Sequence, residues 1–332
     1  MVNKRYILAV DGGATKTASI VYDVVSETVI GSGISGPSNL TSAGVKAASE
    51  NIKRASGWAL EMAGIEFKDL DGGIFGIAGV GDSRSLTETG KGIVKNVTGR
   101  DDFTVLNDGV GAYYLANLGE DGIVFAGGTG SVLFYQKNKE LKRKGGWNWF
   151  VGDDGSASWM AKSGLNVGTM EYDNIYQEKV LVRSAEEYFS MEFHELIPYL
   201  EQHQDKALIA GFSRRVSSTA RSGYKNALNV LHLSATYVSN AIKSAQVEIG
   251  TNKNISLVGG TYMAGDVYVS MIEKQLGTTP KIFFGYQVAV GALLYLMNIN
   301  GMDISFPIRD KILRQFEETG VREKYSKLLN SF

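Results

Sequence analysis

A glycine-rich segment near the start of the chain carries residues suited to binding phosphate. It reads Asp11-Gly12-Gly13-Ala14-Thr15-Lys16-Thr17 and joins two apolar runs. Such a turn between strands offers backbone N–H groups and a threonine hydroxyl to an anion. A carboxylate at its start can hold Mg²⁺, commonly through water. The segment predicts a phosphate-binding hairpin of Asp11, Gly12, Gly13, Thr15 and Lys16, with Asp11 as magnesium ligand; a plain hairpin turn is the alternative.

Two further glycine motifs suit a nucleotide. Gly127-Gly128-Thr129-Gly130-Ser131 again lies between two predicted strands, so Gly128, Thr129, Gly130 and Ser131 form a candidate second phosphate clamp. Gly259-Gly260 follows the apolar run Leu257-Val258, and paired glycines there let the backbone close over a nucleobase or ribose. A simple turn is the alternative for the first of these motifs, and the second is a weak signal by itself.

Asn107-Asp108 is the candidate catalytic motif. It ends a short predicted strand and precedes a predicted helix. Ligands of open α/β sheets gather outside the carboxyl ends of strands, and a carboxylate there can accept a proton from a substrate hydroxyl. The alternative is that Asp108 only caps the helix, a position that favours aspartate.

The segment from Gly145 to Ser156 contains a candidate carbohydrate site. Trp147 precedes the adjacent acids Asp153-Asp154, which lie between glycines. Carboxylates accept hydrogen bonds from sugar hydroxyls, and an indole can cover an apolar sugar face. The alternative is a surface turn that caps a helix beginning at Gly155.

One glycine pattern is rejected as a cofactor motif. The stretch from Gly31 to Gly36 has the spacing of a dinucleotide fingerprint, but Pro37-Ser38-Asn39 follows it and no βαβ unit surrounds it. The Walker pattern Gly-x-x-x-x-Gly-Lys-Ser/Thr is absent from the sequence.

The elements that position these motifs form two similar cycles. Each cycle opens with a strand, a glycine-rich turn and a second strand. The first has predicted strands at 5–10, 17–24, 28–33, 72–78 and 102–106, and helices at 45–63, 86–97 and 110–118. The second has strands at 122–126, 132–136, 255–258 and 281–284, and helices within 155–247, at 262–276 and at 287–296. The basic run 137–144 is expected to be a solvated hairpin tip, and the tail 301–332 a packing helix or a dimer contact.

Composition narrows the class of protein. The chain has 332 residues, which suggests two domains, and its 34 basic and 35 acidic residues give a net charge of −1. No broad nucleic-acid surface is expected from that balance. The absence of cysteine excludes disulfides, thiolate zinc sites and cysteine-held iron–sulfur clusters. No apolar run reaches the roughly 20 residues of a membrane span, so a cytoplasmic protein without membrane partners is expected.

The order of the motifs resembles that of the BadF/BcrA-type ATPase family, and within it the N-acetylglucosamine kinase branch. The resemblance runs from about Tyr6 to about Asn298 and includes Gly36-Pro37-Ser38-Asn39 and Gly145-Gly146-Trp147. It implies the α/β actin-like fold: two RNase H-like domains with mixed five-stranded sheets and an interdomain cleft that closes on ATP. The implied domains are 1–117 with about 286–332, and 118–285.

The resemblance also implies roles for individual residues. It makes ATP and Mg²⁺ the cofactors and Asp108 the base that deprotonates a sugar hydroxyl. The expected phosphate and nucleotide ligands are Asp11, Gly12, Gly13, Thr15, Lys16, Gly128, Thr129, Gly130, Ser131, Gly259 and Gly260. The expected substrate contacts are Asn39, Gly79, Asn107, Asp108, Trp147, Asn148 and Asp153.

Three departures from the amino-sugar kinases bear on the substrate. Asn148 replaces a glycine, Asp154 replaces a glutamate, and Ala78-Gly79-Val80 stands where those kinases have Ser-Gly-Gly. These changes favour 2-keto-3-deoxygluconate, the substrate of archaeal kinases of this family, and an N-acetylglucosamine or hexose kinase is the alternative. A sugar-sensing regulator or an ATPase switch is the alternative of another class. The expected partner is a small sugar or sugar acid, with a homodimer left open.

Overall fold

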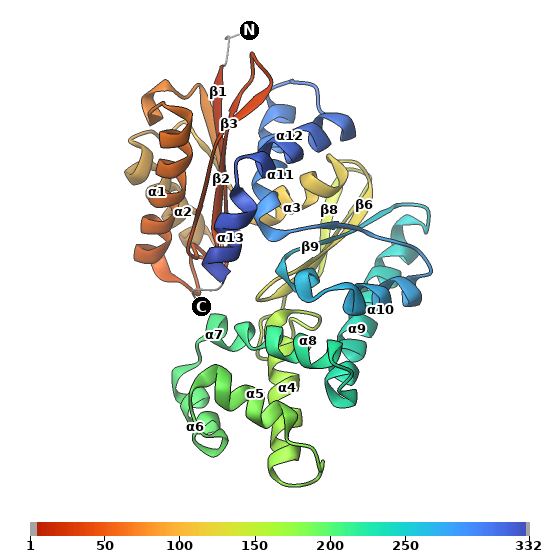
Figure 1. Ribbon diagram of the computed structural model, residues 1–332. Coiled ribbons are helices and arrows are strands. Elements are labelled where there is room, and N and C mark those ends of the chain that lie inside the picture. The colour runs from red at the N-terminus through yellow and green to blue at the C-terminus, as the bar shows by residue number, and fades with distance from the viewer. Residues whose placement is uncertain (1–4, 330–332) are drawn as a thin grey trace. The chain divides into compact units, whose positions relative to one another are not determined.

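The computed structural model describes residues 5–329 and separates into two compact units (Figure 1). The first unit consists of Met1–Glu120 and Phe283–Phe332, and the second of Asp121–Ile282. The chain therefore leaves the first unit once and returns to it with its last helices.

The first unit is built on a five-stranded sheet with the order β3-β2-β1-β4-β5. The first three strands form the predicted antiparallel meander, while β4 lies parallel to β1 and β5 parallel to β4. The strands are β1 (Tyr6–Gly12), β2 (Thr17–Asp23), β3 (Thr28–Ser35), β4 (Gly72–Ile77) and β5 (Thr104–Leu106). Its central strands are buried along nearly their whole length, because helices cover both faces of the sheet.

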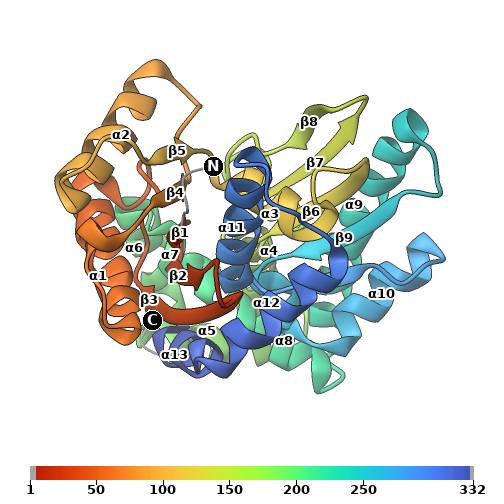
Figure 2. The same ribbon diagram turned by 90° about the horizontal axis from the view of Figure 1, so that it is seen from above.

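Helices α1 (Gly44–Ala63) and α2 (Arg84–Thr98) lie on one side of this sheet, and α3 (Asp108–Asn117) and α11 (Val288–Ile299) on the other (Figure 2). The stripe Ala48, Ile52, Ala55 and Ala59 faces inward along α1, as its spacing predicts. A Cβ atom on Gly31 would lie 2.0 Å from the carbonyl oxygen of Ala59. The glycines of β3 therefore allow α1 to approach the strand closely. This packing explains the glycine pattern, and no dinucleotide-binding role is needed for it.

The tail forms two helices, α12 (Phe306–Glu318) and α13 (Val321–Leu329). Both helices pack against β3. The Gln315 side chain accepts a hydrogen bond from the backbone N–H of Val29 at 3.1 Å and donates one to the carbonyl of Glu27 at 3.2 Å. Both bonds engage backbone groups at the edge of the sheet. Unpaired N–H and C=O groups at such an edge can otherwise pair with other chains. Of the two expectations for the tail, packing describes residues 306–329; residues 330–332 lie outside the described part.

The second unit repeats the strand order of the first, as β8-β7-β6-β9-β10. Its strands are β6 (Gly122–Gly127), β7 (Ser131–Lys137), β8 (Glu140–Gly145), β9 (Asn254–Val258) and β10 (Lys281–Phe283). Strand β8 takes up most of the basic run, and the turn before it holds Asn138 and Lys139 at positive φ. The expected hairpin tip is present there, but the strand that follows it was missed, because none of its residues is buried and they show no alternation of buried and exposed positions.

Helices make up most of the second unit between β8 and β9. They are α4 (Ala157–Tyr172), α5 (Val180–Phe189), α6 (Phe193–His203), α7 (Lys206–Gly211), α8 (Ser213–Arg221) and α9 (Lys225–Ile249), with α10 (Asp266–Leu276) after β9. Short 3₁₀ turns lie at Phe67–Asp69, Gly260–Ala264 and Gly285–Gln287. Among residues 5–329, no helix is both long enough and apolar enough to cross a membrane.

Candidate active site

The carboxyl ends of three parallel strands bring the candidate residues of the first unit together. In the register, Asp11 of β1 lies opposite Gly76 of β4, which lies opposite Leu106 of β5. A Cβ atom on Gly76 would lie 3.4 Å from the Cα of Asp108. The residues that continue these strands include Gly12-Gly13, Gly79 and Asn107-Asp108, so one sheet edge collects them.

The first glycine hairpin is fixed to the segment that contains Asn39. The carbonyl of Gly13 accepts the N–H groups of Ser38 and Asn39 at 2.9 and 3.1 Å, and Thr17 donates its hydroxyl proton to Ser38 at 2.8 Å. The Asn39 Oδ1 atom accepts from the Thr41 N–H and hydroxyl and from the Ser42 N–H. That oxygen therefore holds its own turn, and the Nδ2 group is the part of Asn39 suited to a substrate.

Asp11 and Lys16 form an ion pair at the base of the hairpin. Both side chains are buried, and Lys16 Nζ donates to Asp11 Oδ2. Burial raises the pKa of Asp11, while the charge and hydrogen bond of Lys16 oppose that rise. The sequence predicts Lys16 as a phosphate ligand; in the structure its partner is Asp11. Thr15 lies half-buried in the same turn.

Asp108 is the first residue of α3, and the capping position belongs to its neighbour. The Asn107 side chain accepts the N–H of Gly109 at 2.9 Å and donates to the carbonyl of Val80 at 2.9 Å. The alternative that Asp108 occupies the capping position is therefore wrong. Burial raises the pKa of Asp108 to about 7, and the negative charge of Asp11 adds to that rise against the opposing charge of Lys16.

Because the pKa of Asp108 is raised, the free energy of unfolding is expected to fall as the pH rises. Between pH 4 and 7 the folded protein keeps this carboxyl protonated while the unfolded chain releases the proton. The folded state then binds more protons, so the free energy of unfolding decreases across that window as pH rises. We expect the Tm of Asp108→Asn, relative to the parent, to increase from pH 5 to pH 8, measured by thermal unfolding in EDTA. A pH-independent difference would contradict the assigned pKa.

The donor set of the first unit fits magnesium that arrives with a nucleotide. Mg²⁺ is commonly held by one or two carboxylates together with substrate phosphates, and Asp11 and Asp108 are carboxylates at one sheet edge. No group of three or more His, Cys, Asp or Glu side chains within residues 5–329 could hold a metal by itself. Asp11 is therefore the residue suited to the ion, with the remaining ligands supplied by phosphate and water.

The second glycine hairpin, between β6 and β7, docks on the start of α4. The carbonyls of Gly128 and Thr129 accept the N–H groups of Ala157 and Ser158 at 2.9 and 3.3 Å. The hydroxyl of Ser131 donates to the carbonyl of Asp154 at 2.7 Å. These contacts fix the turn, although they engage the hydroxyl that the sequence assigns to phosphate.

Gly259 lies directly beside this hairpin. Val258 pairs with Ala126 in the parallel strands β9 and β6, and Gly259 follows with φ +132°. A Cβ atom there would lie 2.1 Å from the carbonyl oxygen of Gly127. Only glycine permits that approach, so Gly259-Gly260 and Gly128–Ser131 occupy neighbouring strand ends.

Asp153 has a cationic partner that the sequence did not reveal. Lys206, the first residue of α7, places its Nζ 2.9 Å from Asp153 Oδ2. A Cβ atom on Gly130 would lie 2.7 Å from the same oxygen, so Asp153 is packed against the second glycine hairpin. The two partners are 53 residues apart, and no local pattern marks Lys206 as part of a site.

Trp147 and Asn148 lie on an exposed loop that ends at Gly152. Trp147 is 70% exposed. Asn148 has φ +94°, its Oδ1 accepts the N–H of Phe150 at 3.3 Å and its carbonyl accepts the N–H of Gly152 at 2.8 Å. Asparagine tolerates positive φ better than most residues, so the replacement of glycine here is explained by the turn.

Val80 also has a local structural role. It is buried in the hydrophobic cluster of the first unit with Leu40 and Ile93. Ala78 donates its N–H to the carbonyl of Gly12 at 2.8 Å. Packing therefore accounts for Val80 and turn geometry for Asn148, while nothing in the structure explains the replacements at Ala78 and Asp154.

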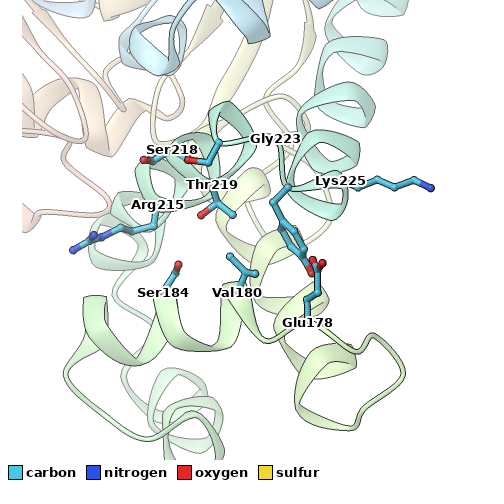
Figure 3. Close-up of a pocket in the computed structure, with 10 residues that line it drawn as sticks. Glu178, Val180, Ser184, Arg215, Ser218, Thr219, Gly223 and Lys225 are labelled. Atoms are coloured by element: carbon cyan, nitrogen blue, oxygen red, sulfur yellow. Dashed lines mark hydrogen bonds between the residues drawn. The ribbon is translucent and has the colours of Figure 1, made fainter.

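Two described cavities lie away from all these residues. One of about 550 Å³ lies between α5 and α8, with Val180 and Ser184 on one wall and Thr219 on the other (Figure 3). Arg215 and Lys225 extend from it in opposite directions. None of the predicted site residues lines this cavity.

Two units with the same strand order, each with a glycine hairpin after its first strand, define the two-domain actin-like class of α/β ATPases. The chain belongs to the BadF/BadG/BcrA/BcrD ATPase family, whose model matches residues 8–295. The family resemblance inferred from the motifs is thereby confirmed.

The chain is similar in sequence to a curated kinase and in fold to two solved structures. The N-acetylmuramic acid/N-acetylglucosamine kinase of Clostridium acetobutylicum is 25% identical over 264 residues, covering 76% of this chain and 83% of the relative. A proposed N-acetylglucosamine kinase from Chromobacterium violaceum superposes with a TM-score of 0.74 at 22% identity, covering 88% and 99% of the two chains. A ROK family glucokinase from Streptomyces griseus, solved with glucose and AMPPNP, has a TM-score of 0.56 at 15% identity, covering 88% and 98%. At these identities the two solved structures show a shared fold.

Proposed function

We propose that this protein is an ATP-dependent kinase that transfers the γ-phosphoryl group to a hydroxyl of an amino sugar of the N-acetylglucosamine type. The observation that carries the proposal is Asp108, a carboxyl group with a pKa of about 7 beside Asp11 at the sheet edge of a family ATPase. A base works best when its pKa lies near the working pH. The Clostridium kinase supports the class of acceptor.

The sequence favours a sugar acid as acceptor and gives an amino sugar as the alternative. Here the amino sugar is the proposed acceptor. None of the relatives reported above acts on 2-keto-3-deoxygluconate by its description, and two are described as amino-sugar kinases. The replacements at Val80 and Asn148 no longer argue for a changed pocket, because the Val80 side chain packs in the hydrophobic cluster and Asn148 Oδ1 accepts a hydrogen bond within its own turn.

In the proposed reaction, Asp108 accepts the proton of the sugar hydroxyl. The hydroxyl oxygen forms a bond to the γ-phosphorus while the bond from that phosphorus to the bridging oxygen of ADP breaks, and Asp108 later releases its proton to water. Bound Mg²⁺ would neutralise phosphate charge near Asp11.

The remaining candidate residues bind and orient. The hairpins at Gly12–Lys16 and Gly128–Ser131 direct N–H groups at phosphates, and Gly259-Gly260 approaches the adenosine. The sugar contacts are Asn39, Gly79, Asn107, Trp147, Asn148 and Asp153. Positioning and electrostatic stabilisation of this kind supply most of the rate enhancement in phosphoryl transfer.

An acceptor screen tests the proposal. ADP release would be followed with ATP and Mg²⁺ alone, and then with N-acetylglucosamine, N-acetylmuramic acid, glucose or 2-keto-3-deoxygluconate. We expect release to require a sugar, and kcat/KM for N-acetylglucosamine to exceed that for the sugar acid by at least about tenfold, the size of one well-made contact. Equal ADP release without any sugar would identify an ATPase switch.

A further inference from the structure

A groove between α4 and α9 of the second unit has no assigned role. Its volume is about 530 Å³, within the usual range of roughly 300–1,000 Å³ for small-molecule sites. Trp159, Lys162 and Asn166 line it from α4 at spacings of three and four, and Asn226 and Asn229 line it from α9 at a spacing of three. Such spacings place side chains on one helix face, so two polar stripes face each other.

Three of the polar side chains that line this α4–α9 groove are amides with unused hydrogen-bonding capacity. Within residues 5–329, no protein group hydrogen-bonds the side chains of Asn166 and Asn229, both of which are exposed. Asn226 donates through Nδ2 to the hydroxyl of Tyr224 at 3.1 Å, which leaves its Oδ1 available. An amide offers two donors and an acceptor, a combination that matches neighbouring hydroxyl groups, each of which donates and accepts.

Aromatic and aliphatic side chains complete the groove. Trp159 is partly buried and Tyr176 is 36% exposed, so both have ring surface at the wall. A ligand that uses these rings and three amides must combine an apolar face with several hydroxyls. Sugar rings have that combination, whereas a purely apolar ligand would leave the amides unpaired, which is costly in a desolvated site.

The groove is connected to the candidate site of the same unit through Lys162. Its Nζ donates to the carbonyl of Trp149 and lies 5.3 Å from the centre of that indole ring. Trp149 belongs to the loop of Trp147 and Asn148, and the charges of Asp153 and Asp154 act on Lys162. One lysine thus borders both the groove and the proposed sugar-binding loop.

We propose that the α4–α9 groove is a second carbohydrate-binding site, which takes one pyranose ring. The ring could come from two sources: the second ring of a disaccharide acceptor, in which case the inference rests on the proposed kinase function, or a free sugar that binds independently. Asn166 and Asn229 determine the affinity in both cases.

The test uses the full chain and two probes, N-acetylglucosamine and its β-1,4-linked disaccharide. Calorimetry without nucleotide measures binding, and ADP release measures kcat/KM, for the parent, Asn229→Ala and Asn166→Ala. Ser184→Ala, in the cavity between α5 and α8, is the matched control. Both asparagines are exposed, so their variants should keep the parental Tm.

We expect each asparagine variant to weaken disaccharide binding by about fivefold, the value of one hydrogen bond, with Ser184→Ala unchanged. If the asparagine variants weaken binding of the disaccharide only, the groove takes the second ring of an acceptor. If they instead remove a second binding event of the monosaccharide, the groove takes a free sugar. Binding of both probes that is unaltered in Asn229→Ala and Asn166→Ala overturns the proposal. If no sugar is phosphorylated, the kinase function fails, while calorimetry still decides the groove.

Discussion

Asp108→Asn is expected to lower kcat by about 10²–10⁴-fold, the usual loss when a general base is removed. The amide keeps the size of the side chain and cannot take the proton of a sugar hydroxyl. Since Asn107 performs the capping of α3, helix stability should be retained. Steady-state ADP release with saturating N-acetylglucosamine measures kcat. Nucleotide affinity measured by calorimetry should stay within about threefold of the parent, because the amide has the size of the carboxyl group.

Asp101→Asn provides the matched control for that experiment. Asp101 lies just before β5, is largely exposed and pairs with Lys95 at 3.2 Å. Asp101→Asn also removes one negative charge, at a position seven residues before Asp108 that does not belong to the candidate site. We therefore expect kcat to be unchanged. If Asp108→Asn also retained near-normal kcat, Asp108 would not be the base, and the reaction would need another proton acceptor.

Asp11→Ala is expected to have the largest effect on stability, lowering the free energy of unfolding by about 3–5 kcal/mol. The substitution leaves the ammonium group of Lys16 buried without its carboxylate. Breaking a buried pair from one side exposes the full desolvation penalty of the other charge. Urea unfolding monitored by circular dichroism gives the difference, and nucleotide binding should be lost as well, because Asp11 begins the first hairpin that we propose to bind phosphate.

The double variant Asp11→Ala/Lys16→Met separates stability from function. It removes both charges and replaces the lysine stem with an apolar one, so most of the lost stability should return. Activity should not return, because neither variant restores a carboxylate at position 11. An unchanged unfolding midpoint in Asp11→Ala would show that the ion pair does not stabilise the fold, and recovered activity in the double variant would remove Asp11 from the phosphate site.

Local patterns in the sequence were sufficient for most elements of the first unit. The meander of β1, β2 and β3 and the inward stripe of α1 depend on alternation and on helical spacing, which neighbouring residues alone define. The glycine hairpins and the position of Asn107-Asp108 were also local, because a turn and a strand end are set by adjacent residues. The family followed from the order of those motifs.

Local patterns failed where a contact joined distant parts of the chain. Strand β8 was missed because pairing with β7, and not its own composition, makes it a strand. The packing of α12 against β3 includes hydrogen bonds between Gln315 and residues 286 and 288 positions away, contacts that no local spacing indicates. The sugar-acid expectation assumed that the replaced residues face a pocket, whereas Val80 packs in the hydrophobic cluster of the first unit and Asn148 holds a turn.

By itself, then, the sequence determined the strand–turn–strand openings and a carboxylate at a strand end, and it predicted a phosphate-binding role for the glycines of those openings. Tertiary structure alone decided which charges are paired: Lys16 with Asp11, and Lys206 with Asp153. It also decided that Asn107 caps α3, which leaves Asp108 beside Asp11 with a raised pKa. The physical reason is that hydrogen bonding at a turn acts over a few residues, whereas burial and Coulomb interaction depend on distance in space, which only the folded chain defines.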